Sequence, residues 1–145
     1  MIADRKGVID LPVKLMVVVL IISISVPLLT DAVERGEADN ASYAMNSEIE
    51  RIFKAVAAVH YSGIGSSRTV SVSIPDGCGI TIPGGDGSDG YSVKMSFKGH
   101  DLGTRFMDRP PVRFISGGLV ITGNCLLLIT SDISGGSAAA RVTAV

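Results

Sequence analysis

Few side chains in this sequence have types and a spacing that could support chemistry. The two cysteines, Cys78 and Cys125, both lie in the second half of the chain, well apart in sequence. Beyond a segment that crosses a membrane, an even number of separated cysteines is typical of an oxidised pair outside the cell. We therefore expect a Cys78–Cys125 disulfide, worth about 4 kcal/mol in the chain-entropy model. The alternative is two unpaired, buried thiols.

The possible metal ligands are sparse. His60 and His100 have no metal-ligand spacing with each other or with a cysteine. Residues 84–91 match one copy of a glycine–aspartate calcium repeat, with Asp86 and Asp89 as candidate ligands. That kind of site needs several stacked copies to supply enough oxygen atoms, so a flexible hairpin loop with glycines at positive φ is favoured. No metal and no cofactor are expected.

Composition and motifs exclude further classes of function. The net charge of −1 and the pI of about 6.1 give no electrostatic basis for binding nucleic acid. The sequence contains no nucleophile elbow, no zinc-binding helix and no phosphate-binding loop. We therefore expect a protein that is not an enzyme.

The longest apolar run covers residues 8–29, about the length that a helix needs to cross a bilayer. Helix is expected there, because backbone groups in lipid must bond within their own segment. The only charges in the run are Asp10 and Lys14, which stand four residues apart and can neutralise each other. Arg5 and Lys6 precede the run. Acidic residues follow it: Asp31, Glu34, Glu37 and Asp39. This asymmetry predicts a cytoplasmic N-terminus and an exported remainder.

The helical pattern continues through residues 30–61 with a narrower apolar stripe. The stripe has spacings of three and four residues: Met45, Ile49, Ile52, Phe53, Val56 and Val59. Glu50 and Lys54 are placed to form an ion pair on the polar face. Pro27 removes a helical hydrogen bond, so a bend is expected there, and Gly36 marks a second weak point. Asn40 opens an Asn-Ala-Ser glycosylation sequon on the exported side.

Residues 62–145 have a different composition and contain 15 of the 17 glycines. Short alternating runs predict about six antiparallel strands, the clearest at residues 91–97. Residues 125–130 are apolar on both faces, which favours a central strand, and residues 141–145 fit an edge strand. The predicted fold class is α+β, with one long helix packed on a small antiparallel β head.

These features together resemble the type IV pilins, most closely archaeal pilins and archaellins. The motif consists of Arg5 and Lys6, then Gly7, then the apolar run; bacterial members differ in usually having a glutamate at the position of Pro12. The resemblance implies a class III leader at residues 1–7 that a prepilin peptidase removes between Gly7 and Val8. It also implies a helix over residues 8–61 and a "lollipop" head at 62–145. By analogy, Asp10 would neutralise the new amine of a neighbouring subunit.

The function that the resemblance implies is structural. The precursor would reside in the cell membrane. A membrane assembly platform would then add it to other copies of the chain in a helical surface filament. Three alternatives stay open: a minor or pseudo-pilin of a filament tip or secretion-type assembly, a monomeric surface-binding domain held by an uncleaved helix, and a secreted domain cut after Ala32. The first residue of the mature chain separates the last two from a pilin.

Overall fold

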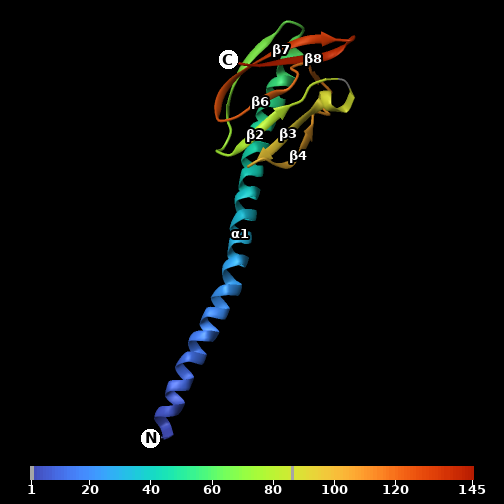
Figure 1. The fold of residues 1–145 in the computed structure, drawn as a ribbon. Coiled ribbons are helices and arrows are strands. Elements are labelled where there is room, and N and C mark those ends of the chain that lie inside the picture. Colours follow the sequence, from blue (N-terminus) through green and yellow to red (C-terminus); the bar gives the residue numbers. More distant parts are fainter. Residues whose placement is uncertain (1, 86) are drawn as a thin grey trace. The chain divides into compact units, whose positions relative to one another are not determined.

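The computed structural model describes residues 2–85 and 87–145, with side chains from residue 10 onward. One long helix, α1 (Ile2–Ser62), precedes a β-rich head (Figure 1), so the α+β class is confirmed. The sequence predicted a helix over residues 8–61. The observed helix begins earlier and ends within one residue of the prediction, and it stays continuous through Pro27 and Gly36.

The chain divides into two compact units, Met1–Glu37 and Ala38–Val145. The boundary lies within α1, well before the predicted start of the head at residue 62. The second unit therefore contains the last part of the helix together with all the strands that the structure describes. The strands alone do not form a complete domain, because their apolar faces need the helix to cover them.

Within the described residues, the head has two four-stranded sheets. The first has the order β1-β7-β8-β5, and the second has the order β4-β3-β2-β6. The strand bounds are β1 Ser67–Ser73, β2 Cys78–Ile82, β3 Ser92–Phe97, β4 His100–Phe106, β5 Arg113–Phe114, β6 Leu119–Ile121, β7 Asn124–Ser134 and β8 Ser137–Ala144. A short 3₁₀ helix, η1 (Gly87–Tyr91), precedes β3.

The strand predictions were partly right. Strand β7 lies between β1 and β8, as the apolar run at residues 125–130 predicted. Strand β8 pairs with β7 along its length, whereas the short β5 pairs with it only at Ala139 and Ala140, so among the described strands the predicted edge residues from Arg141 to Ala144 pair with β7 alone. The β5–β8 pair is parallel, so the head is not purely antiparallel. Strand β4 was not predicted, because its sequence has no alternating apolar residues.

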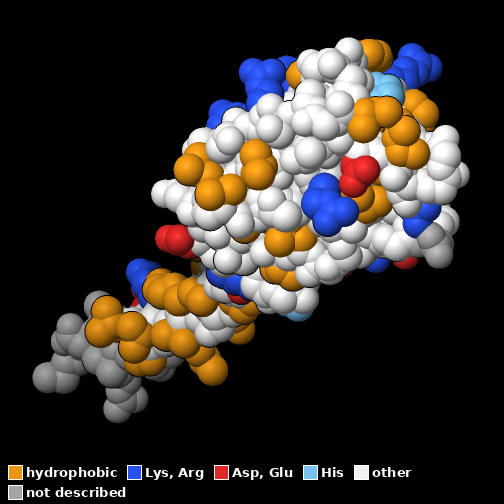
Figure 2. Space-filling model, turned by 90° about the horizontal axis from the view of Figure 1, so that it is seen from above, with side chains coloured by type: hydrophobic (Ala, Val, Ile, Leu, Met, Phe, Trp, Pro, Cys, Tyr) orange, Lys and Arg blue, Asp and Glu red, His pale blue; other side chains and the backbone are white. Residues whose placement is uncertain are grey.

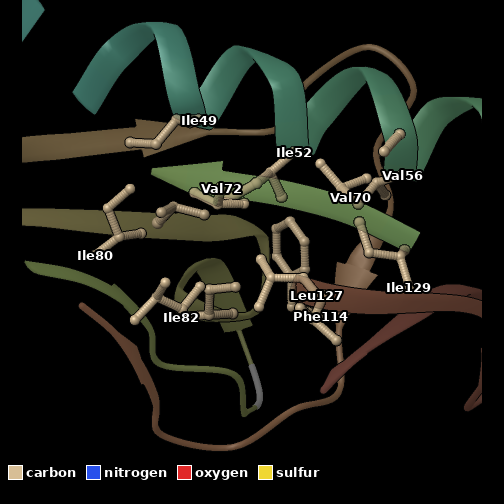
Figure 3. Packing of buried hydrophobic residues seen from close by; sticks show 14 of the residues in the cluster. Ile49, Ile52, Val56, Val70, Val72, Ile80, Ile82, Phe114, Leu127 and Ile129 are labelled. Carbon is tan, nitrogen blue, oxygen red and sulfur yellow. The ribbon is translucent and has the colours of Figure 1, made fainter. Parts of the chain in front are cut away.

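The core of the head lies between the sheets and the last part of α1 (Figure 3). The predicted helical stripe is confirmed, since Met45, Ile49, Ile52 and Val56 are fully buried. In Figure 3, Ile49, Ile52 and Val56 point from the helix toward labelled side chains of the strands. At about 1.5–3 kcal/mol for each buried side chain, these four contribute on the order of 10 kcal/mol of hydrophobic stabilisation. This stripe is what holds the helix to the head.

Polar side chains on both sides of the stripe bond the edge strands of the two sheets. On one side, Glu48 accepts a hydrogen bond from the Ser73 N–H at 3.2 Å, and Arg51 donates to the Ser71 carbonyl at 3.2 Å. Both partners belong to β1, whose outer backbone groups would otherwise be open. The helix therefore also covers a sheet edge.

On the other side of the stripe, Arg105 of β4 reaches the helix. Its guanidinium donates to the Asn46 side-chain oxygen at 2.8 Å and forms a short ion pair with Glu50. It also lies 5.9 Å from the centre of the Phe53 ring, which stacks in turn on Phe114. The predicted Glu50–Lys54 pair is therefore wrong: Glu50 is bonded to Arg105.

Candidate functional site

The most unusual surface of the protein is the apolar part of α1. Every large hydrophobic side chain at residues 11–29 is between 50% and 74% exposed. Among the described residues, α1 is the one helix that is long and apolar enough to cross a membrane, judged by length and composition. Such an all-round apolar helix is stable in lipid or among other apolar helices. We call residues 11–29 the apolar span.

The few polar groups in the apolar span are satisfied within the helix. The hydroxyls of Ser23 and Ser25 donate to the carbonyls of Val19 and Ile21, each at 2.7 Å, and Thr30, just after the span, bonds to Val26 in the same way. Each bond joins a hydroxyl to the carbonyl four residues earlier. These hydroxyls therefore need no water, which suits an apolar environment.

Asp10 and Lys14 form the predicted ion pair, with 2.8 Å between the Lys14 ammonium and an Asp10 carboxylate oxygen. Because the two charges are opposite, the pair as a whole is neutral near the start of the apolar span. Gly7 and Val8 lie within helix α1, but their side-chain environment is outside the described part of the structure. Cleavage between them stays a prediction.

The other helix residues singled out by the sequence have simple surroundings. Pro27 and Gly36 lie inside the continuous helix, and a side chain at Gly36 would meet no atom within 4 Å. The sequon residue Asn40 is exposed, while Ala41 beside it is buried in the head core. The asparagine is therefore accessible, although it lies on a regular helix rather than in a loop.

The expected disulfide is not formed in the structure, where Cys78 and Cys125 are free thiols. Cys78 lies on β2 of the second sheet, paired with Phe97, whereas Cys125 lies on β7 of the first sheet, paired with Val72. The two residues thus belong to different sheets. Burial raises the pKa of both thiols, and Asp76 raises that of Cys78 further. A raised pKa disfavours the reactive thiolate.

The glycine–aspartate stretch is a hairpin connection, because β2 and β3 on either side of it pair in antiparallel fashion. Gly84 has a φ of +62°, and a Cβ there would lie 2.9 Å from the Ser116 carbonyl oxygen, so only glycine fits. Asp89 is exposed on η1, while Asp86 lies outside the described residues. Among the residues that the structure describes, no three acidic, histidine or cysteine side chains gather as metal ligands.

A shallow groove of about 260 Å³ lies where α1 meets the end of β4. Phe53 and Lys54 line it from the helix, and Arg105, Phe106 and Arg109 line it from β4 and the residues that follow. Sequence reasoning missed this groove because β4 was not predicted. On the face of the head that Figure 2 shows, hydrophobic side chains are scattered among polar and charged atoms, whereas they crowd the surface of the helical segment in the same view.

Comparison with known proteins gives no match to a protein-family model, a curated protein or a solved structure. The fold and the site alone define the class: an α+β protein whose long N-terminal helix is apolar enough for membrane association or for a signal segment.

Proposed function

We propose that this protein is a structural, non-enzymatic subunit of a type IV pilus-like filament of the archaeal kind. Its helix would enter the membrane with a cytoplasmic N-terminus, lose the leader at residues 1–7 to a prepilin peptidase, and pass to an extracellular filament. The observation that carries the proposal is that one continuous helix has two unlike parts. Its last part buries one stripe of side chains in a β head, and its apolar span is exposed on every side.

The exposed apolar span supports a polymer for a physical reason. Leaving its side chains in water is unfavourable, because each apolar residue gains about 0.3–0.6 kcal/mol on entering a membrane. Lipid satisfies the span before assembly, and equivalent spans of other copies satisfy it afterwards. A head-to-tail arrangement whose rotation does not close produces a helical filament.

The test is the first residue of the mature protein, read from intact protein recovered from the cell surface. A chain that begins at Val8 supports the proposal, and Gly7→Leu should then leave the full-length chain in the membrane. Images of purified surface material should show filaments that contain this chain. A mature chain beginning at Val33 would show that the span is a discarded signal and would overturn the proposal.

A second candidate is a monomeric surface-binding domain held by an uncleaved helix. The observation that favours it is that the span meets the requirements for a single membrane crossing without any partner copy. A mature chain beginning at Met1 or Ile2, together with a monomer in detergent and no surface filaments, would favour this candidate. A minor or pseudo-pilin role differs from the main proposal in copy number, which quantitative proteomics of the filament measures.

A further inference from the structure

The groove between α1 and β4 contains two cations that form no ion pair with a described carboxylate. Lys54 and Arg109 both line it and are both exposed. Glu50, the carboxylate that the sequence placed opposite Lys54, is bonded to Arg105 instead. Asp108 also lines the groove, so its balance after the Arg105–Glu50 pair is two cations and one carboxylate. The groove thus favours an anionic occupant.

The groove also has an apolar wall. Phe53 lines the groove, with the Arg105 guanidinium over its ring, and Phe106, which also lines it, is 49% exposed. An exposed phenylalanine next to an excess of positive charge suits a ligand that carries carboxylates and an aliphatic side chain together. A simple inorganic anion would leave the Phe106 ring in water.

The same chain carries a segment with that chemistry. Residues 31–39 contain four acidic residues and one arginine, a net charge of −3. Asp31, Glu34 and Asp39 are exposed, and Val33 among them is 60% exposed. We call residues 31–39 the acidic segment. By charge and by its aliphatic side chain the acidic segment complements the groove.

We propose that the groove lined by Lys54 and Arg109 binds the acidic segment of a second copy of this chain. The inference rests on the proposed filament and adds a specific contact to it. The acidic segment lies about twenty residues before the groove on the same helix, so the contact staggers the two copies along the helix axis. Apolar spans can slide past one another, and a charged contact of this kind would fix their register.

The proposal predicts a dependence on charge that can be reversed. The double variant Lys54→Glu with Arg109→Glu should lose most of its filaments, because carboxylates would then face carboxylates. Adding Asp31→Lys and Glu34→Lys to that variant should restore them. The matched control is Arg68→Glu with Lys94→Glu, which changes the net charge equally at exposed positions outside the groove. Thermal unfolding of each full-length variant in detergent shows whether its head is folded.

Crosslinking identifies the occupant directly. A photoreactive benzoylphenylalanine in place of Lys54 should join two copies, with the crosslink mapped by mass spectrometry to residues 31–39. Crosslinks to lipid, to surface polysaccharide or to another protein instead would overturn the proposal. Wild-type filaments should also shed subunits faster in about 1 M salt than in about 0.1 M salt, because added ions screen exposed charges.

The outcomes separate this inference from the proposed function. Wild-type protein that forms no filaments contradicts both. Filaments that form equally well from wild type and from the folded double variant contradict the groove contact alone. Loss in the double variant without rescue by the two added lysines also overturns the contact, because it shows that the lysine and arginine act in another way.

Discussion

Two parts of helix α1, residues 41–59 and residues 11–29, have very different surroundings. At residues 41–59, the apolar side chains form one stripe, and Met45, Ile49, Ile52 and Val56 in it are fully buried by the strands. At residues 11–29, apolar side chains point in every direction and all of them are at least half exposed. Residues 41–59 are therefore stabilised by contacts within their own chain. The apolar span must be stabilised by something outside it.

This contrast separates folding from association. The head and its stripe form a compact unit that begins at Ala38, so we expect its stability to be independent of the apolar span. Conversely, every large hydrophobic side chain of the apolar span is exposed. A substitution in the apolar span should therefore change association without changing the unfolding of the head. A substitution in the buried stripe should change the unfolding of the head without changing association.

The strongest test of this separation places charges in the apolar span. Val18→Glu with Ile22→Glu puts two carboxylates near its middle, and each charge at the centre of a membrane helix costs about 2.5–3.5 kcal/mol. We expect almost complete loss of the chain from the membrane fraction. The midpoint of head unfolding, measured by circular dichroism in detergent, should stay unchanged. Equal membrane recovery of the variant and the wild type would contradict the role of the span.

A large but opposite effect is expected from truncating the buried stripe. Ile52→Ala removes a fully buried side chain from the centre of the core, which typically costs about 2–5 kcal/mol. We expect a lower denaturation midpoint of the head with normal membrane recovery. The matched control is Ile21→Ala, the same substitution at a residue that is 56% exposed in the span. If both variants unfold alike, the two parts of the helix are not independent.

Much of this contrast was predictable from the sequence, because each part depends on a local pattern. The apolar span, the stripe from Met45 to Val59, the Asp10–Lys14 pair and the central position of β7 all follow from spacing and hydropathy. Each of these features is a repeat or a pair of near neighbours within one helix or one strand. Local periodicity therefore carried the information.

The features that were missed or mispredicted depend on residues far apart in the sequence. Glu50 pairs with Arg105 instead of Lys54, and Arg105 lies 55 residues after Glu50 in the sequence. Strand β4, which carries Arg105, contains Gly103 and charged residues instead of an alternating apolar pattern, and it pairs with β3. Likewise the placement of Cys78 and Cys125 depends on which strands share a sheet. Sequence spacing gives none of these pairings.

The Arg105 contacts provide a smaller test of what holds the helix to the head. Arg105→Ala removes a hydrogen bond to Asn46, an ion pair with Glu50 and a contact with the Phe53 ring. Since the ion pair is partly exposed, we expect a loss of about 1 kcal/mol in the free energy of unfolding. Lys54→Ala, on the same helix, removes a cation that bonds no described carboxylate and should leave unfolding unchanged. A loss of the same size in both variants would show that the Arg105 contacts are unimportant.

The smallest expected effect concerns the two thiols, which report how closed the head is. Because burial raises the pKa of Cys78 and Cys125, less thiolate is present at a given pH than for an exposed cysteine. Their labelling by iodoacetamide should therefore be slower near pH 8 than that of an introduced Tyr43→Cys, whose position is 78% exposed, and should accelerate only at higher pH. The folded head holds these protons more tightly than the unfolded chain does, so protonated thiols favour the folded state. Its stability should fall as the pH rises above the ordinary cysteine pKa of 9.0. Labelling of both native cysteines as fast as Tyr43→Cys would show a loosely packed head, whereas no labelling before reduction would show that they are joined as a disulfide.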